Sequence, residues 1–236
     1  NKFIKSNIND FYKLLICSKE YSDKIKNNEF KFIQISTDEV YGSLSKLDKP
    51  CKENTLFNPS SPYSSSKAAA ELILNSFIKT FNFQGIITRC TNNYGKNQNK
   101  EKFIPKIISS CLQNKKIPIY GNGQQTRDWL FVEDHCRAIY TILQKGKIGL
   151  SYNISSGNEI TNIFLAKFIC QKLDKIYNNS ETNSFKKLIE FVNDRPAHDT
   201  RYSLDNSFIK KNLKWKARVS FETGINQTIS WYLKNI

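Results

Sequence analysis

The chain has 236 residues, of which 39% are hydrophobic and 13% aromatic, and this composition excludes an intrinsically disordered protein. Lys and Arg number 36 against 21 Asp and Glu, which gives a net charge of +15, but most basic residues are lysines spread singly along the chain. A nucleic-acid site concentrates its charge, so we do not expect such a partner. No run reaches the roughly 18 apolar residues of a membrane helix, so we expect a cytoplasmic protein without membrane contact.

The first half of the chain alternates between predicted helices and strands. Apolar spacing predicts an amphipathic helix over 4–19, and an apolar, β-prone run predicts a buried strand over 30–35. A polar loop over 44–62 is followed by a helix over 63–81 and a strand over 85–89. This alternation predicts an α/β fold with a doubly wound (Rossmann-type) parallel sheet.

Composition changes from Asn92 onward toward Asn, Gly, Lys and Gln, which indicates a second, smaller α+β region. Its predicted elements are a helix over 103–112, a strand and glycine turn over 115–125, a helix over 132–143, a strand over 152–155, a helix over 161–175, a polar loop over 178–187 and a strand over 188–192.

The cysteines predict no metal site and no redox motif. They form no Cys-x-x-Cys pair, and no pair of histidines lies near them. We interpret all six as reduced, mostly buried thiols, namely Cys17, Cys51, Cys90, Cys111, Cys136 and Cys170.

Two stretches carry the predicted chemistry. Thr37, Asp38 and Glu39 fall at the carboxyl end of the first strand, where ligands bind in open α/β sheets. Tyr63 and Lys67 are four residues apart at the start of a helix, so they share one face. The lysine should favour the phenolate and make Tyr63 a base, although such a pair alone also fits a solvated helix face.

Adjacent carboxylates can differ in pKa when their environments differ, and one can then donate a proton while the other accepts one. Asp38 and Glu39 therefore fit an elimination of water. Taken alone, Thr-Asp-Glu is also typical of a strand end followed by a helix cap.

With these motifs the sequence resembles the dTDP-glucose 4,6-dehydratases, members of the extended short-chain dehydrogenase/reductase family. Related epimerases lack the Asp-Glu pair, and related decarboxylases usually carry Thr-Ser-Glu, so Asp38 selects the dehydratases. The resemblance covers nearly the whole chain, in Ser36 to Gly42, Tyr63 to Lys67, Thr88 to Gly95, Ile119 to Gly123, Arg127 to His135 and Asp194 to Asp199.

The resemblance implies a role for each matching residue. Thr37 would contact the C4 hydroxyl of the sugar, Asp38 would protonate the departing C6 hydroxyl, and Glu39 would be the base at C5. Tyr63 and Lys67 would act at C4. The cofactor would be NAD, held by Ser36, Tyr63, Lys67 and Asn93, and the nucleotide sugar dTDP-glucose would be held by Thr37, Asn92, Lys102, Phe103, Pro118, Tyr120, Arg127, Asn162, Asp194, Arg195 and His198.

The family also implies a division of the chain. Residues 1–92 would be the remainder of an NAD-binding Rossmann domain, with 128–150 packing back on it, and 93–236 would mainly bind the nucleotide sugar. The helices over 4–19 and 63–81 would form the four-helix interface of a homodimer.

The sequence departs from the family in three ways. Ala197 replaces a usual glycine, and the loop between the two catalytic motifs is short. No glycine-rich turn follows any predicted strand, so the fold is expected to be N-terminally incomplete by about a hundred residues. Two alternatives remain open on these grounds: a related epimerase or decarboxylase, and a catalytically inactive remnant or binding protein.

Overall fold

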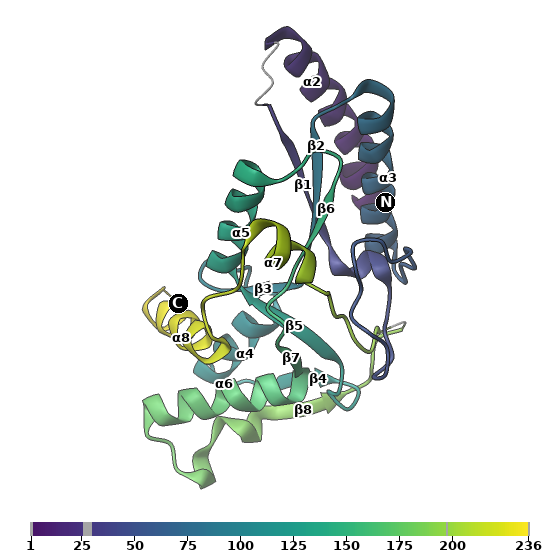
Figure 1. The fold of residues 1–236 in the computed structure, drawn as a ribbon. Helices are drawn as coiled ribbons and strands as arrows, with labels where there is room; N and C mark the ends of the chain where they lie inside the picture. Colours follow the sequence, from purple (N-terminus) through teal and green to yellow (C-terminus); the bar gives the residue numbers. More distant parts are fainter. Residues whose placement is uncertain (1, 26–29, 197, 236) are drawn as a thin grey trace.

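The computed structural model describes residues 2–25, 30–196 and 198–235, and its first layer is a parallel sheet (Figure 1). The sheet has the order β1 (Phe32–Thr37), β2 (Gly85–Cys90), β6 (Ser151–Ile154), and all its pairs are parallel. Parallel strands need crossover connections, and here each crossover contains helices. The predicted α/β fold is therefore confirmed.

Helices cover both faces of this sheet (Figure 1). On one face, α2 (Asp10–Ile25) and α3 (Pro62–Phe81) pack on Ile87, and on the other, α5 (Val132–Lys145) and α7 (Ser207–Leu213) pack on Ile86. Neighbouring residues of a strand point to opposite faces, so consecutive isoleucines serve the two cores.

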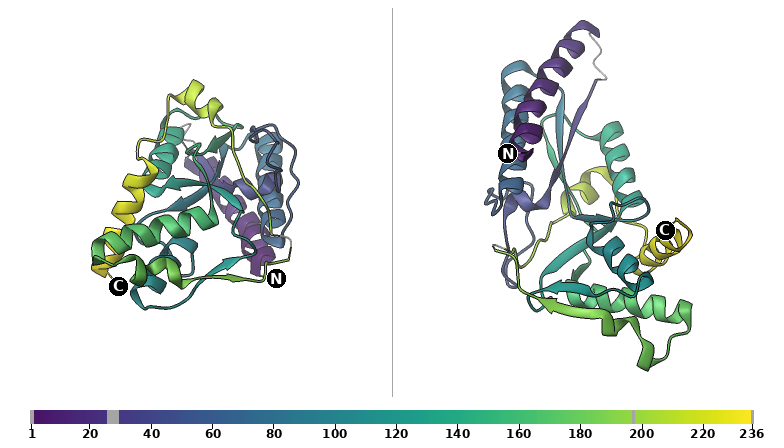
Figure 2. Two further views of the ribbon diagram at one scale, coloured as in Figure 1. Left: turned by 90° about the horizontal axis from the view of Figure 1, so that it is seen from below. Right: turned by 180° about the vertical axis from the view of Figure 1, so that it is seen from behind.

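The second part of the molecule forms its own core at the other end (Figure 2). Two small sheets and three helices surround a cluster that includes Ile108, Trp129 and Ile169. The sheets have the orders β3 (Asn92–Tyr94), β5 (Thr126–Phe131), β7 (Glu159–Thr161), and β4 (Ile117–Tyr120) with β8 (Ile189–Val192); the helices are α4 (Phe103–Leu112), α6 (Asn162–Tyr177) and α8 (Phe221–Asn235).

Several sequence expectations need correction. The N-terminal helix is longer than 4–19: α1 (Lys2–Ile4), a π-helical turn over Lys5–Asn9 and α2 run on to Ile25. The first strand begins at Phe32 and includes Thr37, two residues later than expected at both ends. The strand β5 and the helices α7 and α8 have no counterpart in the prediction.

The cysteines also differ from expectation, because only half of them are buried. Cys51, Cys111 and Cys170 are buried, whereas Cys17 and Cys136 are exposed on α2 and α5. Both exposed thiols lie on amphipathic helices, whose outer faces accept any small side chain.

Segments after residue 150 also join the first layer, since β6 pairs with β2 and α7 packs against β6. The division into 1–92 with 128–150, and 93–236, stays a prediction. None of the described helices combines the length and the apolar character that crossing a bilayer requires.

Candidate functional site

The strand β1 ends in a tight turn that presents two acids. Thr37, still extended, donates to Asp38 Oδ1 at 3.2 Å and accepts from the amide of Glu39 at 3.3 Å, which caps the 3-10 helix η2 (Asp38–Tyr41). Gly42 then leaves the turn at φ +80°, and a Cβ there would lie 2.1 Å from the carbonyl oxygen of Asn58. The glycine is therefore required by both its backbone angle and its close contact.

The Asp38 carboxyl is 5% exposed, and burial raises its pKa to about 7, with the negative charge of Glu39 adding to the rise. The hydrogen bond from Thr37 opposes it. Asp38 Oδ2 makes no hydrogen bond within the part of the chain that the structure describes. A carboxyl with these properties can hold a proton at neutral pH and give it up.

Glu39 lies in a different environment. Burial is the largest cause that raises its pKa. Among its charged neighbours Arg127 comes first and lowers the pKa, Asp199 raises it, and Lys102 and Arg195 lower it with smaller effects. The strongest charged neighbour of Glu39 is therefore a cation, whereas that of Asp38 is another acid. This is the unlike pair of environments that an acid and a base require.

The helix α3 fixes the third catalytic candidate. Ser61 and Ser64 form a reciprocal capping box and Pro62 occupies the first turn, so the helix begins firmly just before Tyr63. Lys67, one turn later, donates its Nζ to the carbonyl oxygen of Ile35 on β1 at 2.7 Å.

Tyr63 does not have a lowered pKa in this arrangement. Burial is the largest cause that raises the pKa of Tyr63 to about 12, and the negative charge of Glu39 is the next. The ammonium of Lys67 donates to the carbonyl oxygen of Ile35, and the expectation that it favours the Tyr63 phenolate stays a prediction.

Unpartnered polar atoms collect beside this helix at the edge of the sheet. Ser36 Oγ and Asn93 Oδ1 are buried without a partner in the described structure. Asn93 Nδ2 donates to Cys90 Sγ at 3.3 Å, and burial raises the pKa of the Cys90 thiol to about 12, so it stays neutral. Buried polar atoms usually have partners, so this donor and acceptor set fits a polar ligand such as the NAD implied by the resemblance.

A buried ion pair, which the sequence reasoning missed, holds the acids and the helix together. Glu71 Oε2 of α3 accepts from Arg89 Nη2 of β2 at 2.6 Å, and both side chains are almost fully buried. Arg89 Nη1 donates to the Tyr41 hydroxyl at 2.6 Å, and its guanidinium lies 5.1 Å from the centres of both the Tyr41 and the Phe57 rings. We call Glu71, Arg89 and Tyr41 the clamp, because it joins α3, β2 and η2.

A pocket of about 370 Å³ lies in the second part of the molecule. Nine predicted substrate residues line it: Asn92, Lys102, Phe103, Pro118, Tyr120, Arg127, Asn162, Arg195 and His198. Asn93, which was predicted to hold the cofactor, lines it too. Five more were not predicted: Gln98, Glu101, Lys106, Ile119 and Trp129. The rings of Phe103 and Trp129 stack with centroids 6.4 Å apart, so one wall of the pocket is aromatic.

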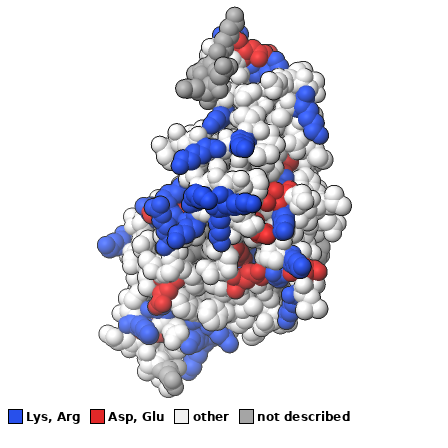
Figure 3. Space-filling view, viewed as in Figure 1, with Lys and Arg blue, Asp and Glu red and all other residues white. Residues whose placement is uncertain are grey.

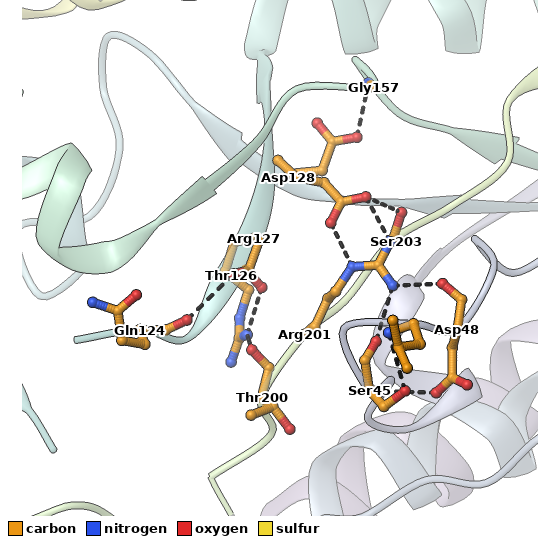
Figure 4. A network of polar contacts seen from close by, with 12 residues as sticks. Ser45, Asp48, Gln124, Thr126, Arg127, Asp128, Gly157, Thr200, Arg201 and Ser203 are labelled. Carbon is orange, nitrogen blue, oxygen red and sulfur yellow. Dashed lines mark hydrogen bonds and ion pairs between the residues drawn. The ribbon is translucent and has the colours of Figure 1, made fainter. Parts of the chain in front are cut away.

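Arg127 bridges the pocket and the acids. Its terminal nitrogens donate to the carbonyl oxygens of Thr126 and Asp199, each at 2.8 Å, and its guanidinium lies 4.4 Å from the centre of the Tyr202 ring. Figure 4 shows it folded against its own strand and Thr200. Arg127 therefore fixes the segment after residue 198 in addition to lining the pocket.

The neighbouring Arg201 anchors the same segment on its other side. It forms two hydrogen bonds with the carboxylate of Glu159, at 2.5 and 2.8 Å, and donates to the carbonyl oxygens of Ser45 and Asp48 (Figure 4). The loop 44–62 is thereby tied to the rim of the site.

Asp194 does not line the pocket, but it contacts His198, which does. Its carboxylate contacts His198 Nδ1 at 2.5 Å and accepts from Gln125 at 2.9 Å, and the hydrogen bond with His198 is the first cause that lowers its pKa. Arg195 lies over the ring of Tyr120 at 5.2 Å. Ala197 lies outside the described residues.

Comparisons with known proteins agree with this site. The family model described as GDP-mannose 4,6-dehydratase matches residues 1–228. A dTDP-glucose 4,6-dehydratase from Haemophilus influenzae is 45% identical over 99% of this chain and 70% of its own length. The chain belongs to the dTDP-glucose 4,6-dehydratase family.

Solved structures of this family share the fold. The enzyme from Bacillus anthracis, solved with NAD, is 40% identical with a TM-score of 0.80, covering 92% of this chain and 65% of its own. The enzyme from Streptomyces venezuelae, also with NAD bound, is 34% identical with a TM-score of 0.88, covering 100% and 68%. The chain therefore spans about two thirds of the length of these dehydratases.

Proposed function

We propose that this chain carries out the dehydratase chemistry of its family on dTDP-glucose with NAD as cofactor. The observation that carries the proposal is the pair of unlike carboxyl groups on one turn: Asp38, with a pKa of about 7, and Glu39, whose strongest charged neighbour is Arg127. Such a pair suits removal of water from adjacent carbons, with one acid and one base.

Ser36, Lys67 and Asn93 would hold the nicotinamide half of NAD, since two of them offer buried unpartnered oxygens and the third an ammonium. When bound, NAD would supply the hydride acceptor at C4 and the hydride donor at C6. Tyr63 would accept the proton of the C4 hydroxyl. With a pKa of about 12, it needs positive charge close to its oxygen, and Lys67 supplies this if its Nζ moves from Ile35 toward the phenol.

In the elimination, Glu39 would take the proton from C5 and Asp38 would give its proton to the C6 hydroxyl, which leaves as water. Thr37 would orient the C4 hydroxyl and holds Asp38 in place through their hydrogen bond. The clamp fixes the position of these acids relative to Tyr63, because it connects η2 with α3.

The pocket beside them would hold the nucleotide. Arg195 and Lys102 offer charge for phosphate oxygens, and the stacked rings of Phe103 and Trp129 offer an apolar wall for a base.

The test is an assay for the 4-keto-6-deoxy sugar formed from dTDP-glucose and NAD. We expect product from the wild-type chain, and none above background from Asp38→Asn with Glu39→Gln. Product that instead is an epimer of the starting sugar, or no turnover by a chain that binds both ligands, would refute the proposal.

We also propose a homodimer and a cytoplasmic location. The helices α2 and α3 expose large apolar side chains that a partner copy would cover, and large exposed apolar patches mark such contacts. These side chains are Tyr12, Leu14, Ile16, Tyr21, Ile25, Leu72 and Phe81.

A further inference from the structure

A second pocket, of about 340 Å³, lies between the carboxyl-terminal half of α5 and the segment that follows α7. Its wall includes five cationic side chains: Arg137, Lys145, Lys214, Lys216 and Arg218. Figure 3 shows lysines and arginines gathered over this part of the surface. We call it the basic pocket.

Asp134, the acid beside the basic pocket, already has an ion-pair partner and hydrogen-bond donors. Asp134 is fully buried, pairs with Arg137 and accepts the backbone amides of Arg218 and Val219, each at 2.9 Å. Asp134 therefore pairs with one of the five cations, Arg137. Grouping like charges costs free energy, and an anion in the pocket would offset that cost.

The helix dipole explains the position of only two of these five cations. Lys145 and Lys214 lie at the carboxyl ends of α5 and α7, where the helix dipole favours a cation. Lys216 and Arg218 lie beyond α7 and before α8, so no helix end attracts them. Their position on the pocket wall needs another explanation.

Trp215 supplies an independent sign of a ligand. It lines the basic pocket, is 5% exposed, and its Nε1 is buried without an acceptor among the described residues. A buried indole N–H normally donates a hydrogen bond, and leaving it unpaired is costly. An anionic oxygen in the pocket would accept it.

We propose that the basic pocket binds a small anion carrying at least two phosphate groups. The cations surround a concavity whose volume is at the lower end for small-molecule sites, whereas a nucleic-acid surface would spread them along an open stripe. This site shares no lining residue with the proposed nucleotide pocket, so the inference does not depend on the proposed function.

The test is calorimetric titration of the full chain with inorganic triphosphate and orthophosphate at low ionic strength. We expect saturable binding of triphosphate, weaker binding of orthophosphate, and at least about tenfold weaker triphosphate binding in Lys216→Gln with Arg218→Gln. The matched control is Lys210→Gln with Lys211→Gln, which removes equal charge from exposed positions on α7 outside the pocket. It should bind triphosphate within about twofold of wild type.

Two more variants locate the site. Trp215→Phe should weaken binding because it removes the N–H and keeps an aromatic ring, while Arg195→Gln in the nucleotide pocket should leave this binding event in place. Equal weakening of triphosphate binding by the Lys216/Arg218 variant and the Lys210/Lys211 control would overturn the proposal. Loss of this binding in Arg195→Gln would also overturn it. A duplex DNA probe that binds more tightly than triphosphate through Lys216 and Arg218 would overturn the small-ligand assignment.

Discussion

Burial raises the pKa of the Asp38 carboxyl to about 7, so its protonated form is populated at neutral pH. The proton that elimination requires is therefore already on the protein. The sequence placed Asp38 and Glu39 at a strand end, but it could not show that their environments differ. Part of that difference comes from Arg127, which is remote in the sequence and is the strongest charged neighbour of Glu39.

We predict that the elimination step slows as the pH rises through about 7, since Asp38 must be protonated to act. Asp38→Asn should slow elimination by at least about 100-fold and leave C4 oxidation intact. Single-turnover kinetics that follow reduced cofactor and product separately distinguish the steps. Equal impairment of oxidation and elimination would contradict this role.

The same carboxyl should lower stability at alkaline pH. Its folded-state pKa is raised from 3.8, so its contribution to stability is fully present below about pH 4 and is lost as the pH rises through about 7. At pH 8, Asp38→Asn should therefore unfold at a higher urea concentration than wild type. Its free energy of unfolding should be greater by up to about 4 kcal/mol. Asp48→Asn is the control, because the pKa of exposed Asp48 is lowered, and it should not stabilise.

Tyr63→Phe should abolish C4 oxidation and leave binding of the nucleotide sugar nearly unchanged, because the ring still packs against Phe3 and the pocket residues lie elsewhere. Rapid-quench analysis and equilibrium binding check the two halves. If binding is lost together with oxidation, Tyr63 has a structural role.

At the scale of elements, periodicity predicted those that bury one face. The helix 103–112 was predicted with its observed bounds, and 63–81 differs from α3 by one residue. The strand β5 was missed because its polar start, Thr126 to Asp128, breaks the apolar pattern. Those polar groups instead bind partners from distant segments, such as Ser156 and Asp199. No local pattern contains that information.

The clamp links α3, β2 and η2 through a buried ion pair and a hydrogen bond. Glu71→Ala should leave the guanidinium of Arg89 buried and unpaired, which costs about 3–5 kcal/mol. Chemical denaturation measures the loss, and Glu20→Ala, an exposed acid on α2, should change stability by less than about 0.5 kcal/mol. Equal effects of the two substitutions would show that the pair is not needed.

At the scale of the whole molecule, α2 and α3 present an apolar surface that the sequence pattern alone did not reveal as exposed. We predict a dimer in sedimentation equilibrium, and a monomer for Leu72→Asp, whose side chain is 60% exposed on α3. The control is Phe191→Asp, equally exposed on β8 at the other end, which should remain dimeric. A monomeric wild-type chain would contradict the proposed interface.

The clamp also constrains how this family can diverge. A substitution at Glu71 or Arg89 alone passes through a protein with an uncompensated buried charge, which few folded chains survive. Exchange of both for apolar residues of similar volume costs far less. In an alignment of descendants, positions 71 and 89 should therefore be conserved together or substituted together. Exposed lysines should vary independently of one another.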